Sequence, residues 1–346
     1  MSSLEVRGLE ARNGAFALGP VSFSLAEHDV LAVQGPSGSG KTTLLRALAG
    51  FLPVAPGALL RDGEDLGALP PESRGVGYVP QGLGLFPHRT VRGNVSYPME
   101  IRDRPNPRRV VETLLDRFGL TALASRYPAT LSGGERQRVA MARALAAEPS
   151  WLLWDEPYAS LDLEARESLL ETLELGLSDR PVPVLLVAHE PGLAYALARK
   201  VLVLDAGRPV YLGGVERMRR APPNAFTARL SGYENVFPRS QLVALSDSPF
   251  ARSLLARSGP EGVAFYAEDA RWSPGPGEER FPLTVRGLRP APRGWIVRGV
   301  SQEGLGLSLL WPEANSTPPP APGTSLPFHV GHLWPLGLPR DEGGAD

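Results

Sequence analysis

A glycine-rich stretch from Gly35 to Thr42 has the residue types and the spacing of a phosphate-binding loop. It reads GPSGSGKT and matches the pattern G-x-x-x-x-G-K-[ST]. Glycines allow a tight turn whose backbone N–H groups point at one phosphate, and a helix that begins there adds a partial positive charge. Lys41 would reach the terminal phosphates of a nucleotide, and the Thr42 hydroxyl would bind Mg²⁺. The alternative is a glycine-rich turn between a strand and a helix that binds nothing.

Lysine is rare in this chain, which draws attention to Lys41. Of the 36 Lys plus Arg residues only Lys41 and Lys200 are lysine, so the other 34 are arginine. A codon bias towards arginine explains the ratio. Under such a bias, a retained lysine marks a position where the wide planar fork of arginine does not fit. We expect such a role for Lys41, whereas chance accounts for Lys200.

Two acids, Asp155 and Glu156, follow the apolar run from Trp151 to Trp154. In a parallel sheet, ligands bind beyond the carboxyl ends of the strands, so both acids are expected near the phosphate-binding loop. Asp155 would hold Mg²⁺, because hard cations prefer oxygen ligands. Glu156 would point at an attacking water. Taken alone, an Asp-Glu pair after a strand is often only a solvated turn.

A second candidate anion site begins at Ser132, in the sequence LSGGE. Ser132 and Glu135 form the S-x-x-E pattern of a capping box at the start of a helix. An ordinary capped helix explains this pattern. Gly133 and Gly134 also allow a ligand to approach the backbone closely, which would suit a terminal phosphate.

These residues lie among apolar runs that alternate with helical patterns. Strands are expected at Val30 to Gln34, Val76 to Val79, Trp151 to Trp154, Val182 to Ala188 and Val201 to Leu204, and helices at Lys41 to Phe51, Arg108 to Phe118, Glu135 to Ala147 and Leu163 to Leu175. Alternating strands and helices predict a largely parallel sheet covered on both faces. Beyond about residue 222, short alternating runs separated by Pro and Gly predict a small β domain of barrel or sandwich type.

Composition excludes several classes of protein. The chain of 346 residues has no cysteine, which excludes a disulfide scaffold, a thiolate metal site and a cysteine nucleophile. A formal net charge of -1 argues against nucleic-acid binding by bulk charge. The apolar runs are far shorter than the roughly 18 residues that span a bilayer, and the N-terminus lacks the layout of a signal peptide. We therefore expect a soluble, cytoplasmic type of chain.

Together these motifs resemble the ATP-binding subunits of ABC transporters over roughly residues 4–235. The phosphate-binding loop, LSGGERQR from Leu131 and WLLWDEP from Trp151 match the family in order and spacing. Gln81 in YVPQ resembles the family's Q-loop glutamine, the stretch from Ser160 to Asp162 its D-loop, and His189 its switch histidine. The resemblance implies an α/β P-loop NTPase domain at residues 1–233, with a helical subdomain at roughly 84–148. A small all-β, barrel-like (OB- or TOBE-like) domain is expected at 234–346, with a disordered tail.

The resemblance also assigns roles to residues. It implies ATP and Mg²⁺ as cofactors, with Glu156, His189 and Gln81 as catalytic residues and Thr42, Gln81 and Asp155 around the metal. The expected nucleotide-binding residues are Gly35, Pro36, Ser37, Gly38, Ser39, Gly40, Lys41, Thr42, Thr43, Phe16, Ser132, Gly133, Gly134 and Asp162. Phe16 is the candidate for stacking on adenine, with Arg12 as the alternative.

The family forms head-to-tail dimers in which each ATP lies between the loop of one subunit and the LSGGE segment of the other. The resemblance therefore implies a homodimer on the cytoplasmic face of the membrane, peripheral and bound to permease subunits, with an extracytoplasmic substrate-binding protein and no nucleic-acid partner. Residues Leu85 to Pro87 would lie near the permease. Molybdate, tungstate or another oxyanion is the expected cargo, with ferric iron, polyamines or sugars as alternatives. A soluble ABC ATPase that acts as a mechanical or regulatory switch is the rival class.

Two departures from the family's pattern concern regulation rather than chemistry. Ala159 stands where the D-loop commonly has Ser, and the sequence after His189 lacks the acidic pair usual in importer subunits. Neither change removes a catalytic group.

Overall fold

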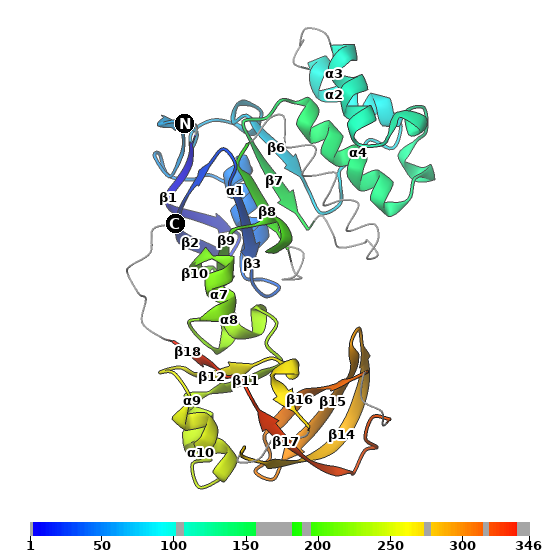
Figure 1. Ribbon diagram of the computed structural model, residues 1–346. Helices are drawn as coiled ribbons and strands as arrows, with labels where there is room; N and C mark the ends of the chain where they lie inside the picture. The colour runs from blue at the N-terminus through cyan, green and yellow to red at the C-terminus, as the bar shows by residue number, and fades with distance from the viewer. Residues whose placement is uncertain are drawn as a thin grey trace. The chain divides into compact units, whose positions relative to one another are not determined.

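The structure, a computed structural model, describes residues 3–101, 107–156, 182–188, 195–272, 278–313 and 318–337. The chain divides into two compact units, Met1–Val215 and Glu216–Asp346 (Figure 1). Among the described residues, no helix is both long and apolar enough to cross a membrane. The domain boundary expected at 233/234 stays a prediction.

The first unit is built on a six-stranded sheet in the order β10-β9-β3-β8-β7-β6. These strands are β3 (Val30–Gln34), β6 (Val76–Val79), β7 (Trp151–Asp155), β8 (Val184–Val187), β9 (Lys200–Asp205) and β10 (Arg208–Gly214). All neighbouring strands pair in parallel except β10, which returns antiparallel to β9. The predicted parallel sheet is therefore confirmed, and Trp151 to Trp154 are almost fully buried within it, as an inner strand requires.

A second, antiparallel sheet has the order β2-β1-β4-β5. It contains β1 (Ser3–Asn13), β2 (Phe16–Ala26), β4 (Leu59–Arg61) and β5 (Glu64–Asp65). We predicted no strand boundaries before Val30. Register shifts between Val6 and Leu9 and between Leu9 and Ala11 break the two-residue alternation from which β1 would be recognised.

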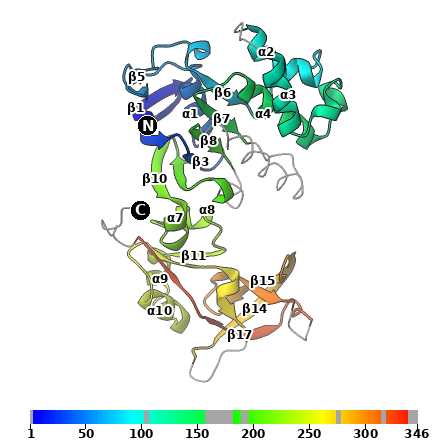
Figure 2. The ribbon, with the colours of Figure 1, turned by 45° about the horizontal axis from the view of Figure 1, so that its top comes forward.

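Helix α1 (Lys41–Ala49) connects the two sheets of the first unit (Figure 2). Leu44 and Leu48 of α1 belong to one buried cluster with Leu4 of β1 and Leu31 of β3. Because α1 contributes to a core shared by both sheets, its N-terminus has a fixed position beside β3.

The helical part of the first unit contains α2 (Val91–Ile101), α3 (Pro107–Arg117) and α4 (Gly133–Ala146). Helices were expected near α3 and α4 but not at α2, which contains Gly93 and Pro98, two residues unfavourable inside a helix. Burial overrides this preference: Val91, Val95 and Met99 recur every four residues and are at most 2 % exposed.

The second unit combines two antiparallel sheets with short helices. β11 (Asn235–Pro238), β12 (Gly262–Phe265) and β18 (Trp334–Leu336) form one sheet, and β13 (Ala270–Arg271), β14 (Phe281–Ala291), β15 (Gly294–Ser301), β16 (Gly306–Pro312) and β17 (Ser325–Val330) form the other. The expected β-rich region is present. The short helices α9 (Arg239–Ala244) and α10 (Pro249–Ala256) were not expected, and Ser248 caps the second of them through a bond from the Ala251 N–H.

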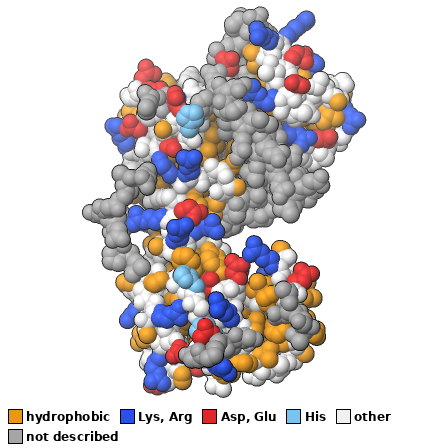
Figure 3. All heavy atoms as spheres, in the orientation of Figure 1, with side chains coloured by type: hydrophobic (Ala, Val, Ile, Leu, Met, Phe, Trp, Pro, Cys, Tyr) orange, Lys and Arg blue, Asp and Glu red, His pale blue; other side chains and the backbone are white. Residues whose placement is uncertain are grey.

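Two helices before residue 233 also belong to the second unit. They are α7 (Val215–Arg220), which begins at the division, and α8 (Ala225–Leu230). Ala228 of α8 and Tyr233 pack with Val236, Ala264 and Leu336 in one buried cluster. This packing explains why the two units divide ahead of α8. Acidic and basic side chains are interspersed over the face drawn in Figure 3, in keeping with the near-neutral net charge.

Candidate functional site

The loop after β3 has the conformation that a phosphate-binding turn requires. Gly38 and Gly40 have φ angles of +80° and +106°, which favour glycine, and the Ser39 N–H closes the turn on the Pro36 carbonyl at 3.1 Å. A Cβ at Gly40 would lie 3.0 Å from the Phe16 ring. The loop therefore depends on glycine both for its conformation and for its contact with β2.

Lys41 begins α1 with its ammonium group turned back onto the loop. Nζ donates hydrogen bonds to the carbonyl oxygens of Gly35 at 2.8 Å and Pro36 at 2.9 Å. The residue is 6 % exposed, and among the described residues no carboxylate forms an ion pair with it. Burial lowers the pKa of Lys41, while the charges of Glu156 and Asp155 act in the opposite direction. A buried cation without a carboxylate in contact suits an anionic ligand.

A cavity of about 310 Å³ adjoins this lysine. Its lining residues come from three separate parts of the first unit: Asn13, Phe16, Ser37, Gly38, Gly40, Lys41, Thr42, Thr43 and Glu156. The Ser39 hydroxyl, buried behind the loop, has no hydrogen-bond partner among the described residues. Cation, loop and carboxylate thus meet around one space, in which the ammonium group and the loop N–H groups are the donors that match the phosphates of a nucleotide.

Phe16 and Arg12 differ in their relation to this cavity. Phe16 is half-buried, lines the cavity and contacts the loop, whereas Arg12 is exposed and does not line it. The geometry therefore favours Phe16 for stacking on a base.

The two acids at the end of β7 have different environments. Asp155 is 5 % exposed and is hydrogen-bonded to the Tyr78 hydroxyl. Burial, together with the charge of Asp155, raises the pKa of Tyr78 to about 12, so this hydroxyl stays protonated at neutral pH. Glu156 has a φ of +56° and donates its N–H to the Val187 carbonyl at 3.1 Å. A left-handed conformation at a residue other than glycine is strained, and such strain is typical of functional sites.

Gln81 meets Glu156 directly, although 75 residues separate them in the chain. Its Nε2 donates to Glu156 Oε2 at 2.7 Å. The structure therefore brings together the predicted glutamine and the predicted base.

The remaining predicted residues lie elsewhere. Ser132 is the N-cap of α4, and both bonds of the expected capping box are present: the Ser132 N–H donates to Glu135 at 2.7 Å, and the Glu135 N–H donates to Ser132 Oγ at 3.3 Å. Ser132, Gly133 and Gly134 do not line the cavity beside Lys41. His189 and the stretch that contains Asp162 lie outside the described residues.

Comparison with known proteins identifies the family. An ABC transporter family profile matches residues 18–159. An Fe(3+) ions import ATP-binding protein of Streptomyces avermitilis is 40 % identical over 251 residues, which cover 72 % of this chain and 73 % of that protein. This chain belongs to the ABC transporter ATP-binding subunits. The predicted family is thus confirmed.

Other relatives of this ABC ATPase are named for the import of different cargoes. A molybdate/tungstate import ATP-binding protein of Thermococcus kodakarensis is 38 % identical and covers 67 % of this chain and 71 % of its own length. A sulfate/thiosulfate import ATP-binding protein of Caulobacter vibrioides is 39 % identical, and the match covers 68 % of this chain and 71 % of that protein. Among solved structures, a dimer of the ATP-binding cassette MJ0796 in a post-hydrolysis state with ADP and Pi matches with a TM-score of 0.54 and 26 % identity, over 61 % of this chain and 98 % of that one. The predicted ABC ATPase fold is confirmed.

This ABC ATPase has an apolar groove of about 530 Å³ on its first unit. Aromatic and aliphatic side chains predominate in it, among them Phe51, Tyr78, Phe86, Tyr97 and Ile101. Phe51 is 52 % exposed and Ile101 is 64 % exposed, which is unusual for large apolar residues close to one another. Phe86 belongs to the segment expected near the permease.

Sequence reasoning missed several residues that support the ATPase site. The buried guanidinium of Arg74 donates to the carbonyls of Ala47, Leu48, Gly67 and Leu69 at 2.8–2.9 Å and so binds the C-terminal end of α1. Tyr78, the partner of Asp155, lies in the expected strand just before Gln81. Its role could not be recognised, because the sequence does not say that β6 adjoins β7. Lys200 also has a partner, since its Nζ lies 2.8 Å from Asp29 Oδ2.

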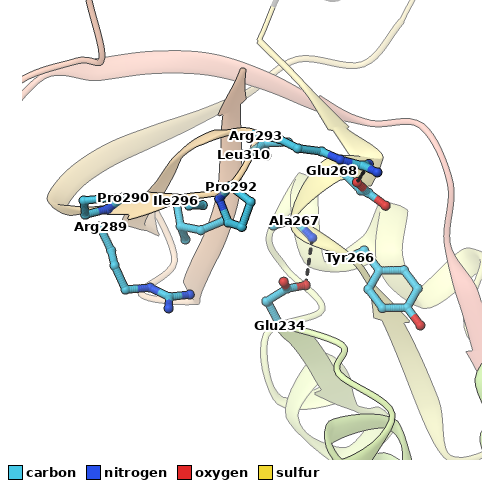
Figure 4. Close-up of a pocket in the computed structure, with 11 residues that line it drawn as sticks. Glu234, Tyr266, Ala267, Glu268, Arg289, Pro290, Pro292, Arg293, Ile296 and Leu310 are labelled. Carbon is cyan, nitrogen blue, oxygen red and sulfur yellow. Dashed lines mark hydrogen bonds and ion pairs between the residues drawn. The ribbon is translucent and has the colours of Figure 1, made fainter. Parts of the chain in front are cut away.

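The second unit contains a cavity of its own, of about 300 Å³ (Figure 4). Ile296 contributes an apolar wall, Arg293 pairs with Glu268 at 3.3 Å, and Glu234 accepts the Ala267 N–H at 3.0 Å. Three of the four charged groups in the lining are thus bonded to one another or to the backbone, and we assign the cavity no ligand.

Proposed function

We propose that this chain hydrolyses MgATP to drive the import of a substrate through a membrane permease. The cavity beside Lys41 is the observation that carries the proposal, because it joins the loop to Glu156, and Glu156 is bonded to Gln81. Phosphoryl transfer depends mainly on positioning and electrostatics, and a rigid loop with a buried cation provides both.

In this proposal the loop residues Gly35 to Thr43 bind the phosphates, with Lys41 as the cation, and Phe16 stacks on adenine. Thr42, Asp155 and Gln81 would hold Mg²⁺, because hydroxyl, carboxylate and amide oxygens are the ligands that this ion prefers. Bound there, Mg²⁺ would neutralise charge that develops on the phosphate oxygens.

Glu156 would accept a proton from the attacking water, and Gln81 would orient that carboxylate and the water. His189 would hold the terminal phosphate and stabilise the charge that develops on it. Asp162 would contribute from the D-loop. Charge-assisted hydrogen bonds of this kind stabilise a transition state more than a ground state.

The capped start of α4 would act in a partner subunit. Ser132, Gly133 and Gly134 form a helix N-terminus that does not line the cavity of their own chain. We propose a head-to-tail homodimer in which they contact the ATP held by the other subunit. The dimeric state of the MJ0796 structure with ADP and Pi supports a dimer of this chain.

The apolar groove around Phe51 and Ile101 would receive a cytoplasmic segment of the permease, which would hold the subunit on the inner face of the membrane. An extracytoplasmic binding protein would deliver the cargo. Relatives named for iron, molybdate/tungstate and sulfate import support an oxyanion or ferric iron, and our preference is an oxyanion. The second unit would be the TOBE-like domain.

Glu156→Gln tests the proposal directly. This variant should retain ATP affinity, lose turnover by about 10²-fold or more, and accumulate as an ATP-bound dimer. Turnover by phosphate release, nucleotide binding by calorimetry and mass by ultracentrifugation give the three readouts. Normal hydrolysis by the variant would remove Glu156 from the role of base.

A further inference from the structure

The glutamine that meets Glu156 lies on a segment that burial alone does not hold. β6 ends just before it, and Gln81 is itself exposed. The Leu83 N–H donates to the Pro80 carbonyl at 2.8 Å, which closes a tight turn that contains Gln81. An exposed turn opens easily unless further contacts hold it. The position of Gln81 therefore depends on what fixes the far end of this turn.

The far end of the turn is bonded to an arginine of α4. Arg143 donates from Nη2 to the Leu83 carbonyl at 2.7 Å and from Nη1 to the Gly84 carbonyl at 2.6 Å. Hydrogen bonds from a charged donor are stronger than those between neutral groups. The planar fork of arginine binds two consecutive carbonyls at once, which the compact ammonium of lysine does less well. One side chain thus fixes the backbone just beyond Gln81.

The backbone conformation of this segment requires support. Leu83 and Gly84 have φ angles of +61° and +58°, in the left-handed region. For leucine this conformation is strained, and it persists only where the surrounding structure imposes it. The Leu83 side chain packs against the buried cluster that contains Val139 of α4, and Arg143 of the same helix binds its carbonyl. Side chain and backbone of Leu83 are therefore both held by α4.

An aromatic ring lies over the same guanidinium. Cζ of Arg143 is 5.4 Å from the centre of the Phe86 ring, and such a contact attracts the cation. The Phe86 backbone is itself fixed, because the buried side chain of Asn94 accepts from its N–H at 2.8 Å and donates to its carbonyl at 3.1 Å. Phe86 thus favours the position from which Arg143 binds the turn.

We propose that Arg143 is a positioning residue of the ATPase, which holds the turn that presents Gln81 to Glu156. Arg143 lines the apolar groove and not the cavity beside Lys41, so it would act through Gln81 rather than on the nucleotide. The proposal rests on the proposed role of Gln81 for its effect on turnover, but not for its effect on the turn.

Hydrogen exchange of the nucleotide-free chain, followed by mass spectrometry, tests the positioning directly. Arg143→Met keeps the length of the side chain and removes both bonds, so the amides of residues 82–84 should exchange at least about tenfold faster. Arg89→Met is the matched control. Arg89 also lies over a ring of the groove, 4.7 Å from the centre of Tyr97, but it bonds to Glu100 of α2 at 2.7 Å. Its loss should leave the exchange of the turn unchanged.

Turnover should separate kcat from KM. A misplaced Gln81 disturbs the attacking water rather than the bound nucleotide, so Arg143→Met should lower kcat about tenfold and change KM for ATP less than about twofold. Arg89→Met should leave both constants within about twofold. If Arg143→Met does not fold, Arg143→Lys replaces it in every measurement, with smaller effects in the same direction, because lysine keeps the charge but not the fork.

A double-mutant cycle with Gln81→Ala shows whether Arg143 acts through Gln81. In the Gln81→Ala background there is no glutamine to misplace, so the addition of Arg143→Met should change kcat less than about twofold. The fall in the urea midpoint caused by Arg143→Met should be the same in both backgrounds, because the bonds to the two carbonyls do not involve the glutamine side chain.

Two results would overturn the proposal. One is an exchange of residues 82–84 that Arg143→Met leaves unchanged. The other is a fall in kcat that is equally large with and without Gln81, since Arg143 would then be merely structural. If Gln81→Ala itself hydrolyses ATP normally, the proposed role of Gln81 fails, whereas hydrogen exchange still decides whether Arg143 holds the turn.

Discussion

At the scale of single residues, the site depends on where two charged groups are held. The Lys41 ammonium lies on two loop carbonyls, and the Glu156 carboxylate accepts a bond from Gln81. The backbone at Glu156 is left-handed, which directs its side chain differently from that of Asp155, one residue earlier. Each group is therefore held by contacts within the chain.

Lys41→Arg should weaken ATP binding by about tenfold or more, because the planar fork of arginine cannot replace a compact ammonium within a buried loop. Calorimetric titration with ATP measures the loss. Lys200→Arg is the matched control: Lys200 is the chain's other lysine, its side chain is 44 % exposed, and it pairs with Asp29 outside the cavity. Equal affinities in the two variants would contradict the role of Lys41.

At the scale of elements, α1 is held at both ends. Its N-terminus continues from the loop, and its C-terminal carbonyls bind the Arg74 guanidinium. A helix C-terminus carries partial negative charge, so a buried arginine there needs no carboxylate partner. Arg74 thus positions the helix whose first residue is Lys41.

Arg74→Met should lower the free energy of unfolding by about 2–4 kcal/mol, because it leaves several buried carbonyls unpaired. Urea unfolding of the whole chain, followed by fluorescence, measures the change. Arg46→Met is the control, since Arg46 is exposed in the last turn of the same helix and its loss should cost less than about 0.5 kcal/mol. If Arg74→Met lowers the free energy of unfolding no more than Arg46→Met does, the four hydrogen bonds of Arg74 contribute little to stability.

At the scale of the whole molecule, the proposed head-to-tail dimer predicts that a complete site needs two copies. One cavity contains Lys41 and Glu156, and Ser132 lies outside it. Mixing two defective variants tests this arrangement. If each site is shared, a defect in the loop of one subunit and a defect in the LSGGE segment of the other can leave one site of the mixed dimer intact.

In a Glu156→Gln background, Ser132→Arg and Lys41→Ala should each abolish the ATP-bound dimer. When the two proteins are mixed, the dimer should return with one ATP, since one of its two sites then has neither defect. Ultracentrifugation and nucleotide counting measure both quantities. If no dimer returns on mixing, the site is not shared.

The groove on the first unit predicts a second association. Ile101→Glu should reduce the recovery of membrane permease subunits with the tagged chain and leave the ATPase rate of the isolated chain unchanged, because Ile101 is far more exposed than buried. Val210→Glu provides the control, since Val210 is an exposed apolar residue outside the groove. Mass spectrometry of detergent extracts identifies the permease. If the Ile101→Glu chain recovers as much permease as the unchanged chain, this groove is not the docking site.

The sequence by itself determined the features that are continuous in the chain. The loop from Gly35 to Thr42, the two acids at the end of β7 and the capping box at Ser132 are each one segment, and local spacing is enough to recognise them. The parallel sheet was predictable for the same reason, because buried strands read as apolar runs. Helix α2 was not, since the burial of one face outweighed its Gly and Pro.

Only the tertiary structure decided which distant residues meet. Gln81 reaches Glu156, Tyr78 reaches Asp155 and Tyr195 reaches Gln34 because of the order of the strands, which local patterns do not specify. Arg74 could be any surface arginine by its sequence, and its role depends on the α1 carbonyls that the fold brings to it. Contacts between distant residues follow from packing of the whole core, and that packing has no signature within a single segment.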